Sequence, residues 1–176
     1  PTFEWLQLAP VLTVLLAACI GVLIEAVVPR RWRFISQIAL FEVAVLVAFV
    51  FLVLSWRLPA NSLGLMAMGS ISLDGPTYLM WGALLVFGLL SLLIFSERDL
   101  DNGSSAFAAS AASVPGSIAE AEANTARHEH SEVFPLALFS LSGMMIFCAA
   151  NDLLTAFVAL EVMSRPLYLL SGMARR

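Results

Sequence analysis

The chain has 176 residues, of which 60% are apolar and only 12% are charged, and its mean hydropathy is +0.91. This composition excludes an ordinary water-soluble enzyme and a small secreted disulfide scaffold, and it is typical of a protein that crosses a membrane several times. The net charge is −4 and all nine basic residues are arginine, with no basic stripe that could follow a phosphate backbone. The sequence therefore predicts an all-α polytopic membrane protein that contacts the lipid bilayer and does not bind nucleic acid.

Five apolar segments are long enough to cross a bilayer as helices. A hydrocarbon layer about 30 Å thick requires roughly 20 helical residues, because each residue rises about 1.5 Å. We interpret the first segment as a span and not as a signal peptide, because three arginines follow it directly as a stop-transfer signal. The predicted spans are 6–28, 35–54, 78–95, 133–150 and 153–173.

The distribution of arginine predicts the orientation of these spans. Arg30, Arg31 and Arg33 place the first connection in the cytoplasm, which leaves the N-terminal end outside. By alternation, segment 56–77 lies outside, segment 96–132 lies inside and the chain finishes inside. Five aromatic residues lie at or near the predicted span ends, where such rings favour the headgroup layer: Trp5, Trp32, Trp56, Tyr78 and Trp81.

The two long connections differ in composition. The outer stretch 69–75, with the sequence GSISLDG, alternates apolar and polar residues before a turn, so we expect a small β-hairpin there. In the inner stretch 102–126, 14 of 25 residues are Ala or Ser. Such a segment buries little apolar surface, and we predict a mobile cytoplasmic insertion.

Glu161 is the strongest candidate for a functional residue. It lies in the middle of the last predicted span, where an ionisable group costs about 3 kcal/mol on insertion scales and is functional by default. We predict that it binds and releases a proton. Arg165 follows four residues later on the same helix face and is its candidate charge partner. The alternative is a neutral or paired carboxyl that only holds two helices together, and Pro166 beside the pair predicts a local weakening of the helix.

Other polar residues are weaker candidates. Glu42 lies about 10 Å into the second predicted span, and we leave a proton-relay role and a helix-packing role equally open. Glu25 lies near the inner end of the first span, where Arg30 is the expected neighbour, and we expect no transport role for it. Asp152 is expected to cap the last helix from the tight turn that precedes it.

No metal or cofactor site is predicted in this chain. His128 and His130 lie in the inner connection and are expected to be solvated. Cys19 and Cys148 fall in apolar runs, where a thiol behaves as a small hydrophobic group. No iron–sulfur spacing or haem ligand pattern appears, so any redox chemistry belongs to a partner.

The segment from Phe139 to Arg176 resembles the subunit N family of the bacterial proton-pumping NADH:quinone oxidoreductase, respiratory complex I. The matching features are GMM, the AND turn, DLLTAF, and LE followed by PLYLL and a basic doublet. The outer SLDGPTYLMW also looks like the loop that precedes the third helix of that family. Arg165 and the long stretch 102–126 depart from the family pattern.

The resemblance implies a non-redox, proton-translocating subunit in the bacterial inner (plasma) membrane, with Glu161 as the family's proton-path glutamate. It implies that this chain is the first part of a longer subunit, whose later helices carry the lysines of the path. NADH, FMN, iron–sulfur clusters and quinone are then expected only in partner subunits, both membrane-embedded and peripheral. The alternatives are a structural membrane scaffold module and a subunit of a multi-component sodium/proton antiporter.

Overall fold

The computed structural model describes residues 5–57, 64–96 and 131–173, and the predicted insertion 102–126 lies outside them. Four of the described helices are long and apolar enough to cross a membrane, and the fifth, α5, has 17 residues and is about 25 Å long. The prediction of an all-α membrane architecture is thereby confirmed, whereas its orientation in the membrane stays a prediction. The long elements are α1 (Trp5–Val27), α2 (Arg30–Trp56), α3 (Gly75–Ser96), α5 (Val133–Ala149) and α6 (Leu153–Met173).

Two helices begin earlier than their apolar segments. α2 begins at Arg30, five residues before the predicted span, because arginine is a good helix former and Pro29, with φ −59°, suits the residue before a helix. α3 begins at Gly75, next to Asp74. The carboxylate of Asp74 accepts hydrogen bonds from the backbone N–H of Thr77 at 3.2 Å and from its hydroxyl at 2.6 Å. Polar residues therefore extend both helices beyond their membrane-spanning part.

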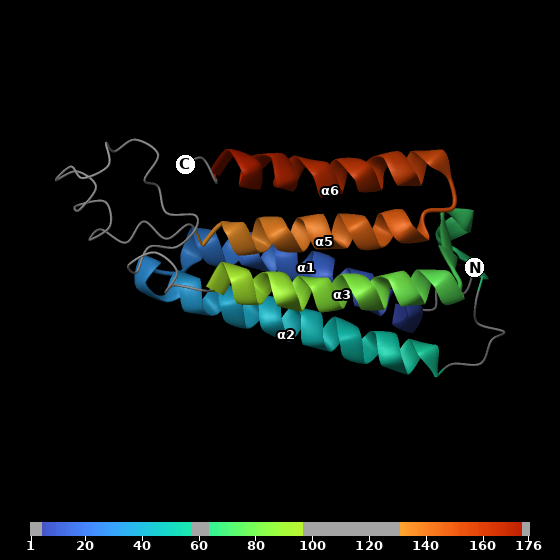
Figure 1. The fold of residues 1–176 in the computed structure, drawn as a ribbon, viewed down its shortest axis with the longest axis horizontal. Coiled ribbons are helices and arrows are strands. Elements are labelled where there is room, and N and C mark those ends of the chain that lie inside the picture. Colours follow the sequence, from blue (N-terminus) through green and yellow to red (C-terminus); the bar gives the residue numbers. More distant parts are fainter. Residues whose placement is uncertain (1–4, 58–63, 97–130, 174–176) are drawn as a thin grey trace.

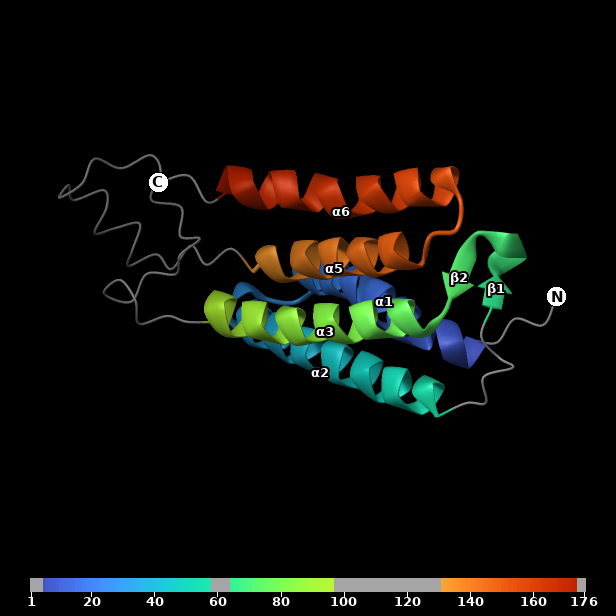
Figure 2. The same ribbon diagram turned by 45° about the vertical axis from the view of Figure 1, so that its right-hand side comes forward.

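The five helices run side by side, with α5 between α6 and the other three (Figures 1 and 2). α1 packs on α2 and α5, and α3 also packs on α2 and α5. α6 packs on α5 and on no other described helix to a comparable extent. One long side of α6 is therefore left uncovered by the described residues.

Small residues let α5 approach its neighbours closely. A Cβ added to Gly143 would lie 2.5 Å from the backbone nitrogen of Met163, so α5 and α6 meet backbone to backbone here. A Cβ on Gly21 of α1 would lie 2.9 Å from the Cβ of Pro135. Gly21 and Gly143 are both buried. Their lack of a side chain sets how closely α1 and α6 pack against α5.

The aromatic residues divide into two groups. Trp5, Trp32 and Trp56 are more than half exposed near helix ends, as the prediction of headgroup contacts requires. Trp81, in contrast, is fully buried, and its indole N–H donates to the carbonyl oxygen of Met145 at 2.7 Å. Its predicted role at the headgroup layer is wrong, because a hydrogen-bond acceptor on α5 lies within reach and the ring fills the bundle instead. The same prediction is wrong for Tyr78, which is buried against Trp81.

The predicted hairpin is present at one end of the bundle. Strand β1 (Gly64–Met66) pairs antiparallel with β2 (Ile71–Leu73), and the 3₁₀ turn η2 (Ala67–Gly69) joins them. Gly69 has φ +91°, a conformation that favours glycine. Asn151 in the α5–α6 turn donates from its backbone to Ser70 at 2.9 Å and from its side chain to Gly69 at 2.8 Å. The hairpin and this turn thus form one connected end of the structure (Figure 2).

Candidate functional site

Glu161 lies in the middle of α6. It is eight residues after Leu153, at which α6 begins, and therefore about 12 Å along the helix axis. The residues around it are mostly apolar, and the helix is long enough to cross a membrane. If such a helix crosses a membrane, a carboxylate at its middle needs a polar partner, because lipid offers no hydrogen-bond donor.

Arg165 is that partner in the structure. Its Nε donates to Oε2 of Glu161 at 2.5 Å, in an i, i+4 ion pair on one helix. The Glu161 side chain is 37% exposed and that of Arg165 is 78% exposed. The pair is therefore only partly covered by the described residues.

The ion pair lies on the side of α6 that faces away from α5. Ala159 and Pro166 are buried, and Ser140 of α5 donates to the carbonyl oxygen of Met163 at 3.2 Å, which identifies the α5-facing stripe. Glu161 is two residues from Ala159, about 200° around the helix at 3.6 residues per turn. The carboxylate consequently points away from the bundle on which its helix is anchored.

Pro166 does not interrupt α6. The helix continues to Met173 although proline offers no N–H to the carbonyl of Val162. The proline ring is buried on the α5 side, and Figure 1 shows α6 as one continuous helix. The weakened turn lies one residue beyond Arg165.

Glu42 lies apart from this ion pair. It is in the middle of α2 and exposed, and it makes no hydrogen bond or ion pair with any residue that the structure describes. α2 and α6 lie on opposite sides of α5 (Figures 1 and 2). The structure therefore does not join Glu42 and Glu161 in one site.

A second polar site lies where α1, α2 and α5 meet. Both carboxylate oxygens of Glu25 accept from the hydroxyl of Ser131 at 2.8 Å. Oε1 also accepts from Arg33 Nη1 at 3.2 Å, and Oε2 accepts from Gln37 Nε2 at 3.2 Å. Gln37 is fully buried and also donates to the carbonyl oxygen of Gly21 at 2.7 Å. Hydrogen bonds to Glu25 thus connect α1 with α2 and with the residue two places before α5.

The sequence did not reveal this arrangement. The expected neighbour of Glu25 was Arg30, whose side chain lies outside the described part of the structure. Among the described side chains the guanidinium comes from Arg33, whose Nε also donates to the carbonyl oxygen of Val28 at 2.6 Å. The spacing of Glu25, Arg33 and Gln37 around Pro29 was a usable signal for contact across a tight helical hairpin. Ser131, far along the chain, carried no such signal.

Asp152 caps α6 as predicted. Its Oδ1 accepts from the backbone N–H of Thr155 at 2.7 Å, and its Oδ2 accepts from the Thr155 hydroxyl at 2.8 Å. The Thr155 backbone hydrogen bond, followed by that of the Thr155 hydroxyl, lowers the pKa of the Asp152 carboxyl from its ordinary value. A charged cap therefore fixes the beginning of the helix that carries Glu161.

Metal ligation finds no support in the described ranges. No group of three or more His, Cys, Asp or Glu side chains comes together there. His128 and His130 lie outside the described residues. Cys19 is exposed and Cys148 is half-buried, and both are free thiols.

Apolar helices long enough to cross a membrane, with α5 between α6 and the other three, define an all-α polytopic membrane architecture, and the ion pair lies halfway along α6. The comparisons with known proteins find relatives that match along the whole chain. The whole chain is 50% identical to NADH-quinone oxidoreductase subunit N of Nocardioides sp., and the match covers 34% of that protein. It is 48% identical to subunit N of Thermobifida fusca and 47% identical to subunit N 3 of Streptomyces griseus, again over the whole chain and over 32% and 33% of those proteins.

The chain therefore spans about a third of the length of these relatives, and it matches their N-terminal third. No family model matches the chain. The resemblance to subunit N that the last two predicted spans carry is confirmed by relatives that match along the whole chain.

Proposed function

We propose that this chain is the N-terminal part of a non-redox, proton-translocating subunit of a bacterial NADH-quinone oxidoreductase in the inner membrane. In this proposal Glu161 is the carboxylate that binds and releases the proton. The observation that carries it is the position of Glu161: a carboxylate halfway along an apolar helix, turned away from the only described helix on which α6 is anchored. The names of the relatives support the choice of complex.

Arg165 supplies a means to control the proton. In the structure the Arg165 guanidinium donates to the Glu161 carboxylate. The Arg165 side chain is mostly exposed and has a long flexible stem, so it can turn toward another partner. If Arg165 moves away, the Glu161 carboxylate loses this partner, and a proton can take its place. We propose that conformational changes elsewhere in the complex drive this exchange.

The partners follow from the same proposal. The uncovered side of α6 is where further helices of the subunit would lie, and they would supply the lysines of the relay. NADH, FMN, iron–sulfur clusters and quinone would be bound by partner subunits, both peripheral and membrane-embedded. This chain would contribute a site for protons and no redox group.

A structural role for the Glu161–Arg165 pair is the alternative. The pair would then have to hold two helices together, yet both of its members are on α6. An i, i+4 pair on one helix is worth only about 0.3–0.5 kcal/mol when exposed. The geometry thus favours proton exchange over anchoring as the reason for a carboxylate at this depth.

Glu161→Gln in the full-length protein, within the assembled complex, tests the proposal. In membrane vesicles we expect normal assembly, with a loss of most NADH-driven proton translocation and of coupled quinone reduction. Glu161→Asp should retain a substantial part of both, because only the reach of the carboxylate changes. Leu160→Gln, which places the same amide at the neighbouring exposed position of α6, is the matched control. Wild-type translocation in an assembled Glu161→Gln complex would disprove the role of this residue.

A further inference from the structure

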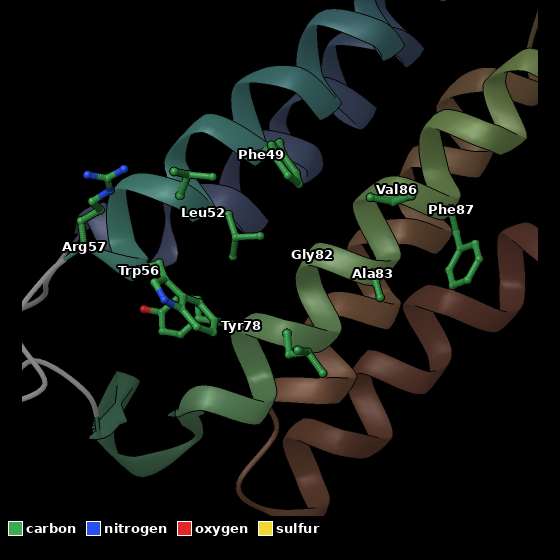
Figure 3. Close-up of a pocket in the computed structure, with 11 residues that line it drawn as sticks. Phe49, Leu52, Trp56, Arg57, Tyr78, Gly82, Ala83, Val86 and Phe87 are labelled. Atoms are coloured by element: carbon green, nitrogen blue, oxygen red, sulfur yellow. The ribbon is translucent and has the colours of Figure 1, made fainter.

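An apolar groove runs between the second half of α2 and the first half of α3. Its volume is about 650 Å³, within the range of roughly 300–1,000 Å³ that small-molecule sites occupy. Gly82 and Ala83 leave the space open on the α3 side, and buried Leu52 lines it on the α2 side (Figure 3). The groove is therefore formed by α2 and α3, and it is separate from the ion pair on α6.

The groove faces outward, away from the bundle core. Phe49 and Val53 of α2 and Val86 and Phe87 of α3 line it, and all four are more than a third exposed. Both helices are long and apolar enough to cross a membrane. From Arg57 to Phe49 the α2 wall extends about 12 Å along the helix axis. The groove thus lies along the apolar part of two helices that are long enough to cross a membrane.

One end of the groove has the chemistry of the headgroup layer. Trp56 is more than half exposed there, and its ring meets the ring of buried Tyr78 edge to face, with centroids 6.3 Å apart. An exposed tryptophan prefers the boundary between hydrocarbon and water. Arg57 follows directly and is exposed, and it has no hydrogen-bonding or ionic side-chain partner within the described ranges. Figure 3 shows its guanidinium at the end of α2, directed away from α3.

We propose that this groove binds a glycerophospholipid, with one acyl chain between α2 and α3 and the phosphate on Arg57. The apolar walls match an acyl chain, and the cation lies at the end where a lipid carries its phosphate. A guanidinium pairs well with phosphate oxygens, because its N–H groups form a planar fork. A helix from a partner protein would fit the walls equally well, but it would have to bring a carboxylate to Arg57. A lipid meets this requirement by its own chemistry, since every glycerophospholipid carries a phosphate at the headgroup end of its acyl chains.

Photo-cross-linking of the full-length protein in its purified complex tests this proposal. The probe is phosphatidylglycerol with a photoactivatable group on one acyl chain, present in phosphatidylcholine vesicles that contain the complex. We expect labelling of segments 49–57 and 78–87. Arg57→Gln should lower this labelling about fivefold, as expected for the loss of one charge near an anionic headgroup. Ala83→Phe should lower it as strongly, because the ring fills the groove.

Two matched variants control for general effects on lipid contact. Arg31→Gln removes an exposed charge from the opposite end of α2, and Ala39→Phe adds a ring at an exposed position of α2 that does not line the groove. Both should leave the labelling unchanged. Equal labelling in wild type and Arg57→Gln would overturn the proposal. Absence of labelling at segments 49–57 and 78–87 of the wild type would also overturn it, because something other than lipid would then occupy the groove.

Discussion

The hydroxyl of Ser131 donates to both carboxylate oxygens of Glu25 at 2.8 Å, although 106 residues separate the two in the chain. This contact ties the residue two places before α5 to the end of α1. Arg33 and Gln37 hold the same carboxylate from α2. The Glu25 side chain is only 18% exposed. Its carboxylate thus joins the ends of α1, α2 and α5 through hydrogen bonds.

We predict that Ser131→Ala destabilises the junction of α1, α2 and α5. A hydrogen bond to a charged group is worth about 1.5–3 kcal/mol, and the carboxylate of Glu25 loses one such donor. The measurement is the temperature at which this subunit becomes sensitive to protease in the detergent-solubilised complex, which should fall. Ser91→Ala is the control, because Ser91 donates only to Phe87 of its own helix. Equal temperatures for the two variants would show that the contact with Glu25 does not stabilise the protein.

Arg165→Leu should lower proton translocation without preventing assembly. The guanidinium is the described partner of the Glu161 carboxylate, so the change removes the group whose movement is proposed to control the proton. Arg165→Lys keeps a positive charge on the same helix face and should retain a larger part of the translocation. NADH-driven translocation in membrane vesicles is the measurement, and a wild-type rate in Arg165→Leu would show that this guanidinium does not control the proton at Glu161.

Gly143→Ala should loosen the attachment of α6 to α5. The added Cβ would lie 2.5 Å from the Met163 nitrogen and 2.8 Å from its Cα, so the two backbones must move apart. Overpacking of this kind costs about 1–3 kcal/mol. Limited proteolysis of the complex should then cut near α6 more rapidly. Gly172→Ala, where nothing lies within 4 Å of the added atom, should leave the rate of cleavage unchanged or lower it slightly.

Asp152 makes the beginning of α6 sensitive to acid. Its pKa is lowered in the folded protein by the backbone and side-chain hydrogen bonds from Thr155. The stability that it contributes is therefore fully present above its unfolded pKa of about 3.9, and it is lost as the pH falls through the lower folded value. Asp152→Asn keeps an acceptor but does not titrate, so the loss of stability in acid should be smaller. Thermal unfolding of the complex at pH 7 and in the acid range measures this difference, and identical acid sensitivity would contradict it.

The spans were predictable because their signal is local. About 20 apolar residues in a row favour a helix in lipid, since a helix pairs the backbone groups within a single segment. The first turn of α2 was missed for the same reason, because Arg30 and Arg33 are polar and lie outside the apolar segment although they continue the helix. The length of an apolar segment reflects only the thickness of the hydrocarbon layer. A helix can continue beyond that layer through polar residues.

The candidate site was predictable only in part. The spacing of Glu161 and Arg165 indicated a contact within one helix, which the structure contains. The sequence did not predict which side of α6 faces α5. Apolar residues occur on all sides of this helix, so their pattern does not single out a buried face. The contact of Glu25 with Ser131 and the groove beside Gly82 depend on how distant segments pack, and no local pattern encodes that packing.

Infrared difference spectroscopy of the purified complex during NADH-driven turnover tests the central claim most directly, because it detects a carboxyl group that gains or loses a proton. The account predicts a protonated-carboxyl band that appears in the wild type, shifts in Glu161→Asp and is absent in Glu161→Gln. A band that stays the same in all three proteins would contradict the claim that Glu161 exchanges a proton.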